Sequence, residues 1–155
     1  MRRIITILFL FSLVPLWAAD PPGVAYWSGT ALKDIEKKLT PKINVQKVAI
    51  EQLGNFGNHS FMVVHREGDG EAEIHESQVD IFVVQTGQAS VIVGGTVVGG
   101  KSTAPGEIRG SSIQGGEKKS LGPGDVMHIP AKTPHQVLVA AGKQLTYLIV
   151  KVDAK

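Results

Sequence analysis

Cysteine is absent from the 155-residue chain. Its absence excludes disulfide bonds, thiolate nucleophiles and thiolate metal ligands, so any bound metal ion must be held by nitrogen and oxygen atoms. An excess of charge is lacking as well, because without Arg2 and Arg3 the 16 basic residues become 14, against 14 acidic ones. A neutral chain with no basic patch offers little to nucleic-acid phosphates, and we expect no nucleic-acid partner.

The chain also lacks an apolar run long enough to cross a membrane, for which about 20 residues are needed. Its first residues, MRRIITILFLFSLVPLWAAD, contain two arginines, an apolar run over residues 4–17 and then Ala18 and Ala19. This pattern is typical of a secretory signal peptide. We therefore expect a signal peptide over residues 1–19 and an exported protein, periplasmic or extracellular, with no membrane attachment after cleavage. A retained single-pass anchor is the alternative.

The rest of the chain has the length of one domain with one core. Residues 20–44 form an N-terminal segment in which we predict one helix, from Ala31 to Leu39, capped by Thr30 and ended by Pro41. Residues 45–155 change to short apolar or alternating runs broken by Gly, Asn and Pro, which indicates an all-β sandwich or barrel. The predicted strands are Val45 to Leu53, Ser60 to Arg66, Ala72 to His75, Val79 to Gln85, Ala89 to Val93, Val126 to Ile129, Gln136 to Ala140 and Leu145 to Val152.

A glycine-rich insertion, residues 94–116, interrupts the strand pattern. Long loops are often functional. Its pieces 107–109 and 112–113 can form a small hairpin. The insertion is either a lid over the barrel mouth, with Arg109 able to bind a carboxylate, or a loop on the outer surface.

Two candidate ligands lie two residues apart in the stretch EAEIHESQVDIFVVQTG. Glu73 and His75 project from the same face of one strand, because side chains alternate between faces. A further histidine, His135, occurs in GPGDVMHIPAKTPHQ. Carboxylate and imidazole donors of this kind suit a divalent metal.

The first of these stretches resembles the first motif of the cupin superfamily. That motif contains two histidines, a Glu and a final glycine at fixed spacings, after an opening glycine. Gly87 takes the place of the final glycine and Asp80, with six residues between them, that of the Glu. His75 takes the place of the second histidine and Glu73 that of the first, and the opening glycine, for which Gly68 is nearest, is one residue out of register.

The second stretch resembles the second cupin motif. Gly124, Pro130 and His135 match its glycine, proline and histidine. Lys132 stands where a second glycine is usual, and Val139 replaces the final Asn. Together the motifs identify the chain as similar to a small single-domain cupin over most of Val45 to Val152, preceded by a signal peptide.

This resemblance implies a single conical β-barrel of the jelly-roll type with an inward-facing metal site, preceded by the short helix. Carried over by position, the metal ligands are Glu73, His75, Asp80 and His135. The implied cofactor is one divalent ion, with Fe, Mn, Zn and Ni all compatible with such donors.

Asp80 and Glu73 are also the candidate catalytic residues. Asp is one methylene shorter than Glu, so Asp80 either binds the ion, orients His75 from behind or acts as a general base. Without a metal, two carboxylates close together are expected to raise one another's pKa values.

An apolar pocket is predicted around this site. Phe82 and Val84 share a strand face with Asp80, while Val137 and Val139 share one with His135. His128, on a neighbouring apolar strand, is included in this pocket as a buried histidine.

The leading functional hypothesis is an exported, metal-binding cupin that acts on a small organic molecule by oxygenase, lyase or isomerase chemistry. The alternative is a metal-free barrel that binds a sugar or a carboxylic acid without catalysis. Some strands, such as Ile81 to Val84, are apolar on both faces, and the outer face can be covered by a second subunit in a homodimer.

Overall fold

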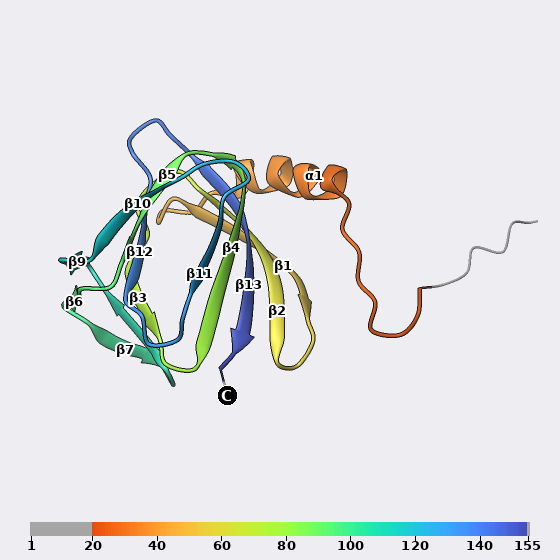
Figure 1. Cartoon of the computed structure of the whole chain (residues 1–155). Coiled ribbons are helices and arrows are strands. Elements are labelled where there is room, and N and C mark those ends of the chain that lie inside the picture. Colours follow the sequence, from red (N-terminus) through yellow and green to blue (C-terminus); the bar gives the residue numbers. More distant parts are fainter. Residues whose placement is uncertain (1–19, 155) are drawn as a thin grey trace, which may run out of the picture.

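Two antiparallel sheets face one another and form an open barrel in the computed structural model, which describes residues 20–154 (Figure 1). The five-stranded sheet has the order β1-β2-β13-β4-β11 and the six-stranded sheet the order β10-β5-β12-β3-β8-β7; β6 and β9 pair separately. The strands are β1 (Val48–Asn55), β2 (His59–Arg66), β3 (Ala72–His75), β4 (Gln78–Gly87), β5 (Ala89–Val93), β6 (Thr96–Val98), β7 (Lys101–Ala104), β8 (Glu107–Gly110), β9 (Ser112–Gln114), β10 (Glu117–Leu121), β11 (Val126–Ile129), β12 (His135–Leu138) and β13 (Leu145–Asp153).

The main core lies between the two sheets. Alternation along β4 shows how it is built: Phe82 and Val84 are buried, whereas Ile81 and Val83 between them are partly exposed. This period of two gives each strand one face toward the barrel interior. The core cluster is completed by Val64, Val91, Leu121, Ile129, Val137, Val139, Leu145, Tyr147 and Ile149.

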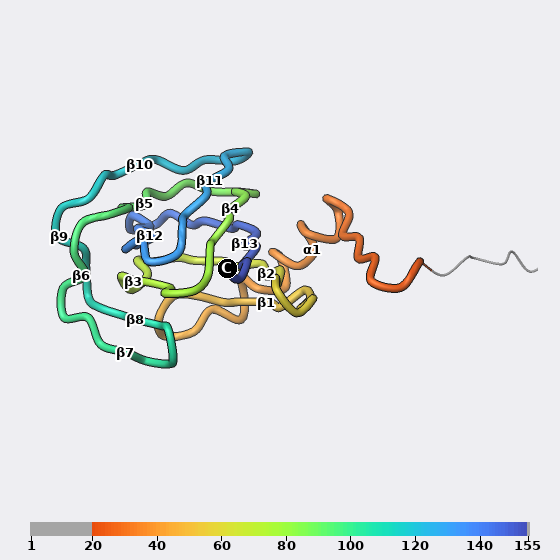
Figure 2. The backbone as a smooth tube through the Cα atoms, turned by 60° about the horizontal axis from the view of Figure 1, so that its bottom comes forward, coloured from red at the N-terminus to blue at the C-terminus, as the bar shows by residue number. Residues whose placement is uncertain are grey.

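The helix α1 (Gly29–Leu39) covers the outer face of the five-stranded sheet near β1 and β2, outside the barrel (Figure 2). Its buried Ile35 and Leu39 pack with Ala49 and Val63 in a second, smaller core. The helix begins two residues earlier than predicted. Its N-cap is Ser28, whose hydroxyl accepts a hydrogen bond from the amide of Ala31, so Thr30 is not the cap.

A polar chain runs from this helix into the sheet. Glu36 Oε1 accepts hydrogen bonds from the hydroxyls of Thr86 and Thr146, the latter at 3.0 Å. Because Thr146 donates to Glu36, its oxygen accepts from Nδ1 of the buried His65 at 2.8 Å. His65 is therefore a structural histidine, hydrogen-bonded within the fold.

The predicted strands are present, and those at residues 72–75, 89–93 and 126–129 have the predicted bounds. The insertion at 94–116 differs from its prediction, because it is largely made of strands. Its two pieces do not pair with each other: β8 pairs with β3 and β7, while β9 pairs with β6. The insertion therefore extends the sheet that carries Glu73 and His75.

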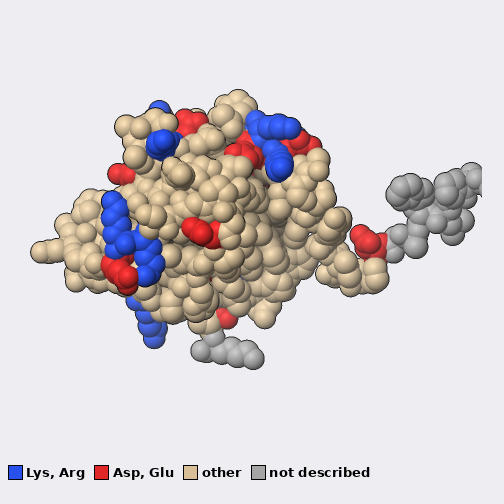
Figure 3. Space-filling view, turned by 45° about the horizontal axis from the view of Figure 1, so that its top comes forward, with Lys and Arg blue, Asp and Glu red and all other residues tan. Residues whose placement is uncertain are grey.

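Charged side chains are scattered over the surface. On the face shown in Figure 3, acidic and basic groups are interspersed among neutral ones. Within residues 20–154, no helix has the length and apolar character needed to span a membrane. The expected signal peptide, residues 1–19, lies outside the described residues.

Candidate functional site

The four predicted ligands converge at the interior side of the barrel, from both sheets. His75 ends β3, and His135 begins the neighbouring β12, where it pairs with Glu73. Asp80 comes from β4 in the opposite sheet. His75, Asp80 and His135 are nearly inaccessible to solvent, and Glu73 is 14 % exposed.

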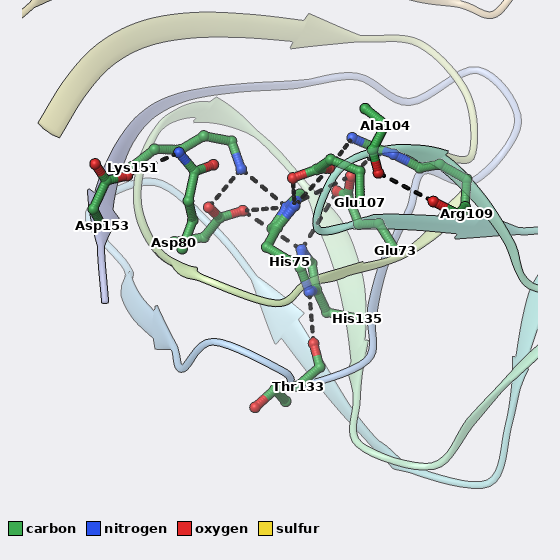
Figure 4. A network of polar contacts seen from close by, with 12 residues as sticks. Glu73, His75, Asp80, Ala104, Glu107, Arg109, Thr133, His135, Lys151 and Asp153 are labelled. Carbon is green, nitrogen blue, oxygen red and sulfur yellow. Dashed lines mark hydrogen bonds and ion pairs between the residues drawn. The ribbon is translucent and has the colours of Figure 1, made fainter. Parts of the chain in front are cut away.

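The Nε2 atoms of the two histidines face the two carboxylates (Figure 4). Asp80 Oδ2 lies 3.3 Å from Nε2 of His75 and 3.5 Å from Nε2 of His135. Glu73 lies 3.8 Å and 3.4 Å from the same two atoms, and one donor atom each from Glu73, His75 and His135 fit within 4.8 Å of one another. The predicted ligand set is thus a cluster in space.

The hydrogen bonds of both imidazoles fix which ring nitrogen carries a hydrogen in the neutral form. Nδ1 of His75 lies 2.7 and 2.8 Å from the two oxygens of Glu107, and Nδ1 of His135 lies 3.0 Å from the carbonyl oxygen of Thr133. These oxygens only accept, so Nδ1 carries a hydrogen in each ring, and in the neutral tautomer this leaves the lone pair on Nε2. Nε2 of His135 is buried without a hydrogen-bond partner among the described residues.

Three charged residues that the sequence analysis did not assign to the metal site complete the cluster. Lys151 Nζ donates to Nε2 of His75 at 2.9 Å and to Oδ1 of Asp80 at 2.7 Å. Arg109, on β8, forms an ion pair with Glu73 and a hydrogen bond of 3.2 Å to Glu107. The sequence predicts Arg109 as an anchor for a ligand carboxylate, whereas in the structure it pairs with carboxylates of the chain.

Asp80 is held in its ionised form. Burial by itself raises the pKa of this carboxyl, but His135, His75 and the Lys151 ammonium outweigh burial and hold the pKa well below its usual range. The expectation that a second carboxylate would raise it is wrong for Asp80, because the two imidazoles and the Lys151 ammonium beside the carboxylate outweigh that effect. Asp80 also lies on the Nε2 side of His75, so the residue that orients His75 from behind is Glu107.

These residues fit a divalent metal ion. Two ligands that each lie about 2.1 Å from an ion are roughly 3.0–4.2 Å apart, and the separations between the Nε2 atoms and the carboxylates are 3.3–3.8 Å. The backing of each Nδ1 by an acceptor is the usual support of a metal-binding histidine. Nε2 of His135, buried and without a hydrogen-bond partner among the described residues, is in addition available to bind a cation.

The predicted apolar wall is packed core. Phe82, Val84, Val137 and Val139 belong to the main cluster, and Phe82 also lies against the ring of His135, with 6.3 Å between ring centroids. His128 does not join them, because Ile129 faces inward on β11 and the alternation turns the adjacent His128 out to solvent.

A cavity of about 620 Å³ adjoins the site at Arg109. Arg66 also lines it, and Nε of Arg66 donates to the hydroxyl of Tyr147 at 3.1 Å. Burial lowers the pKa of Arg109 and the nearby Arg66 lowers it further, while Glu71 opposes the shift. The remaining lining residues are largely polar: Asn44, Gln46, Val48, Ile50, Asp69, Gly70, Glu71, Ser111 and Gln136.

Comparison with known proteins finds no matching family model and no matching curated protein. Solved structures do match. A cupin-2 domain from Rhodospirillum rubrum superposes with a TM-score of 0.51 at 17 % identity, covering 69 % of this chain and 60 % of that one.

Two enzymes give similar values. The polyketide cyclase RemF from Streptomyces resistomycificus has a TM-score of 0.50 at 15 % identity, covering 71 % of this chain and 67 % of its own. The DMSP lyase DddQ from Ruegeria pomeroyi has a TM-score of 0.50 at 17 % identity, covering 68 % of this chain and 47 % of its own. At such identities the likeness concerns the fold, which is therefore the all-β, cupin-type jelly roll that the sequence predicts.

Proposed function

We propose that this chain is an exported, metal-binding cupin that acts on a small polar molecule. The observation that carries the proposal is the convergence of two imidazole Nε2 atoms and two carboxylates, with Nδ1 of each imidazole hydrogen-bonded to an oxygen acceptor. The cupin-type fold, whose solved examples include a cyclase and a lyase, supports it. Export rests on the N-terminal sequence pattern alone.

In the proposed site, His75 and His135 would hold the ion through Nε2, and Asp80 and Glu73 would supply the carboxylate ligands. A divalent ion bound there supplies Lewis-acid chemistry, and with two imidazoles and a carboxylate the donor set also suits iron. Asp80 remains ionised because its pKa is held low, which suits a ligand better than a general acid. Glu107 and the carbonyl of Thr133 keep the imidazoles in the binding tautomer.

The small molecule is proposed to enter through the cavity that Arg109 shares with the site. Because amide, hydroxyl, guanidinium and carboxylate groups line it, this cavity favours a polar molecule, and Arg66 offers a guanidinium group to a ligand carboxylate beside the lining Asp69 and Glu71. The reaction is proposed to be of oxygenase, lyase or isomerase type.

Metal analysis of the purified protein tests this proposal. We expect about one divalent ion per chain after loading and dialysis, measured by elemental analysis, and loss of that ion in the double variant His75→Ala with His135→Ala. His128→Ala is the matched control, because it removes an exposed histidine of the same barrel. Binding that survives the double variant, or no binding in the parent protein, would contradict the proposal.

A metal-free binding barrel is the second candidate. It is favoured by the pairing of Lys151 and Arg109 with the carboxylates, which satisfies most of the cluster without an ion. This candidate predicts no stoichiometric metal, together with calorimetric binding of a sugar or an organic acid that Arg66→Ala weakens. Stoichiometric metal lost on removal of both histidines would exclude it.

A further inference from the structure

The ammonium group of Lys151 lies among the four candidate metal ligands, at the position where a bound cation is expected. It comes from β13, directly across from Asp80 in the paired strand β4. Its ammonium group is 2.7 Å from Asp80 and 2.9 Å from Nε2 of His75 (Figure 4). A positive charge thus already bridges two of the four candidate ligands.

The contact with His75 excludes a metal at the same nitrogen. A neutral imidazole has one lone pair, on Nε2 when Nδ1 carries the hydrogen. Glu107 fixes the hydrogen on Nδ1, so Nε2 of His75 can accept from Lys151 or bind an ion, but it cannot do both. His135 has no such competitor, since its Nε2 is unpartnered among the described residues.

The charge balance of the cluster supports the same conclusion. Three carboxylates face two side-chain cations, which leaves 3 − 2 = 1 negative charge; they are Glu73, Asp80 and Glu107 against Arg109 and Lys151. A divalent ion added to all of them would leave a net positive charge in a nearly buried site, whereas withdrawal of one ammonium leaves the site neutral.

We propose that Lys151 is an internal cation that occupies the metal position in the metal-free protein and must withdraw before a divalent ion binds. This inference rests on the proposed metal site. Lys151 stabilises the empty cluster and at the same time lowers its affinity for metal, so it sets the metal concentration at which the site fills.

The Lys151 side chain has access to solvent. It is 17 % exposed, whereas the Asp80 side chain is 2 % exposed. Lys151 is also close to the end of β13, which finishes at Asp153. A flexible four-carbon stem can move its ammonium into water without a change in the strand.

The first test removes the charge and keeps the length of the side chain. We expect Lys151→Met to bind Zn²⁺ about 10-fold more tightly than the parent protein by calorimetry, which corresponds to one hydrogen bond to a charged group. The metal-free variant should melt at a lower temperature and gain more from Zn²⁺. Lys151→Arg should stay near the parent affinity, and Lys118→Met, which removes an exposed charge on β10, is the matched control.

Equal Zn²⁺ affinity in the parent protein and Lys151→Met would overturn this inference and leave the proposed metal site standing. Absence of Zn²⁺ binding in both would overturn the proposed function and this inference with it. The two failures are therefore distinguishable.

A second test uses the unmodified chain and so does not depend on the folding of a variant. Lys151 is labelled with an amine-reactive acetylating reagent with and without saturating Zn²⁺, and the modification is quantified by mass spectrometry relative to Lys118. We expect Zn²⁺ to raise labelling of Lys151 several-fold, because the ammonium moves into solvent. Unchanged or reduced labelling under saturation would overturn the inference.

Discussion

Glu107 offers the sharpest test of how the imidazoles are held. Both of its oxygens lie within hydrogen-bond distance of Nδ1 of His75, at 2.7 and 2.8 Å, and its side chain is 24 % exposed. Replacement by Gln keeps the size and one acceptor oxygen but removes the negative charge. His75 then loses the carboxylate that fixes its tautomer most strongly. The same carboxylate also makes Nε2 a better donor to a metal.

The expected size of the effect follows from this geometry. Loss of such a supporting partner typically weakens metal affinity by about 10- to 100-fold, or about 1.4–2.8 kcal/mol. Glu107→Gln should fall near the lower end, because its amide oxygen can still accept from Nδ1, and Glu107→Ala near the upper end. Arg109 retains Glu73 as a partner in both variants.

The assay is competition for Zn²⁺ against a chromophoric chelator, with the melting temperature of each metal-free variant recorded alongside. Glu117→Gln is the matched control, because the Glu117 side chain is 71 % exposed and pairs with Lys119, away from the site. If Glu107→Ala binds Zn²⁺ as tightly as the parent protein, Glu107 does not position His75 for a metal, and the tautomer argument is wrong.

Three further predictions concern the fold. Burial raises the pKa of Tyr147, so the phenol keeps its proton to higher pH in the folded state than in the unfolded state. The stability that Tyr147 contributes is therefore present below pH 10 and is lost above it, by up to about 1.4 kcal/mol per pH unit. In denaturant melts, Tyr147→Phe should lack this alkaline loss, whereas the control Tyr26→Phe should retain it. Ser28→Ala should lower the free energy of unfolding by about 1 kcal/mol through loss of the helix cap, whereas Thr30→Ala should change it little, as measured by chemical denaturation. Gly87→Ala should cost about 2 kcal/mol or more, because φ is +81° and a Cβ would overlap the backbone before β13; an unchanged melting curve would contradict this.

The strands and the clustering of Glu73, His75, Asp80 and His135 were predictable because their signals are local. Alternation places Asp80 on the inner face of β4 with Phe82, and the two motif spacings select His75 and His135. The prediction that His128 is buried is wrong, because alternation along its short strand does not show which face points into the barrel.

The supporting charges were missed because their placement depends on long-range pairing. Glu107 and Arg109 lie in a glycine-rich stretch with little apolar alternation, and only the pairing of β8 with β3 brings them beside Glu73 and His75. Lys151 did leave a signal. It shares a strand face with the buried Tyr147 and Ile149, and a lysine that continues an inward-facing series is uncommon unless it has a buried partner.

The hydrogen bonds of Glu36 fix the position and direction of α1 on the five-stranded sheet. Apolar contacts alone are tolerant of direction, so a short helix held by Ile35 and Leu39 could slide or rotate over the sheet at small cost. A carboxylate that meets two threonine hydroxyls, one of them linked to His65, permits a single alignment. The main contribution of Glu36 is therefore to select one orientation of α1 on the sheet, and it adds less to the strength of the contact.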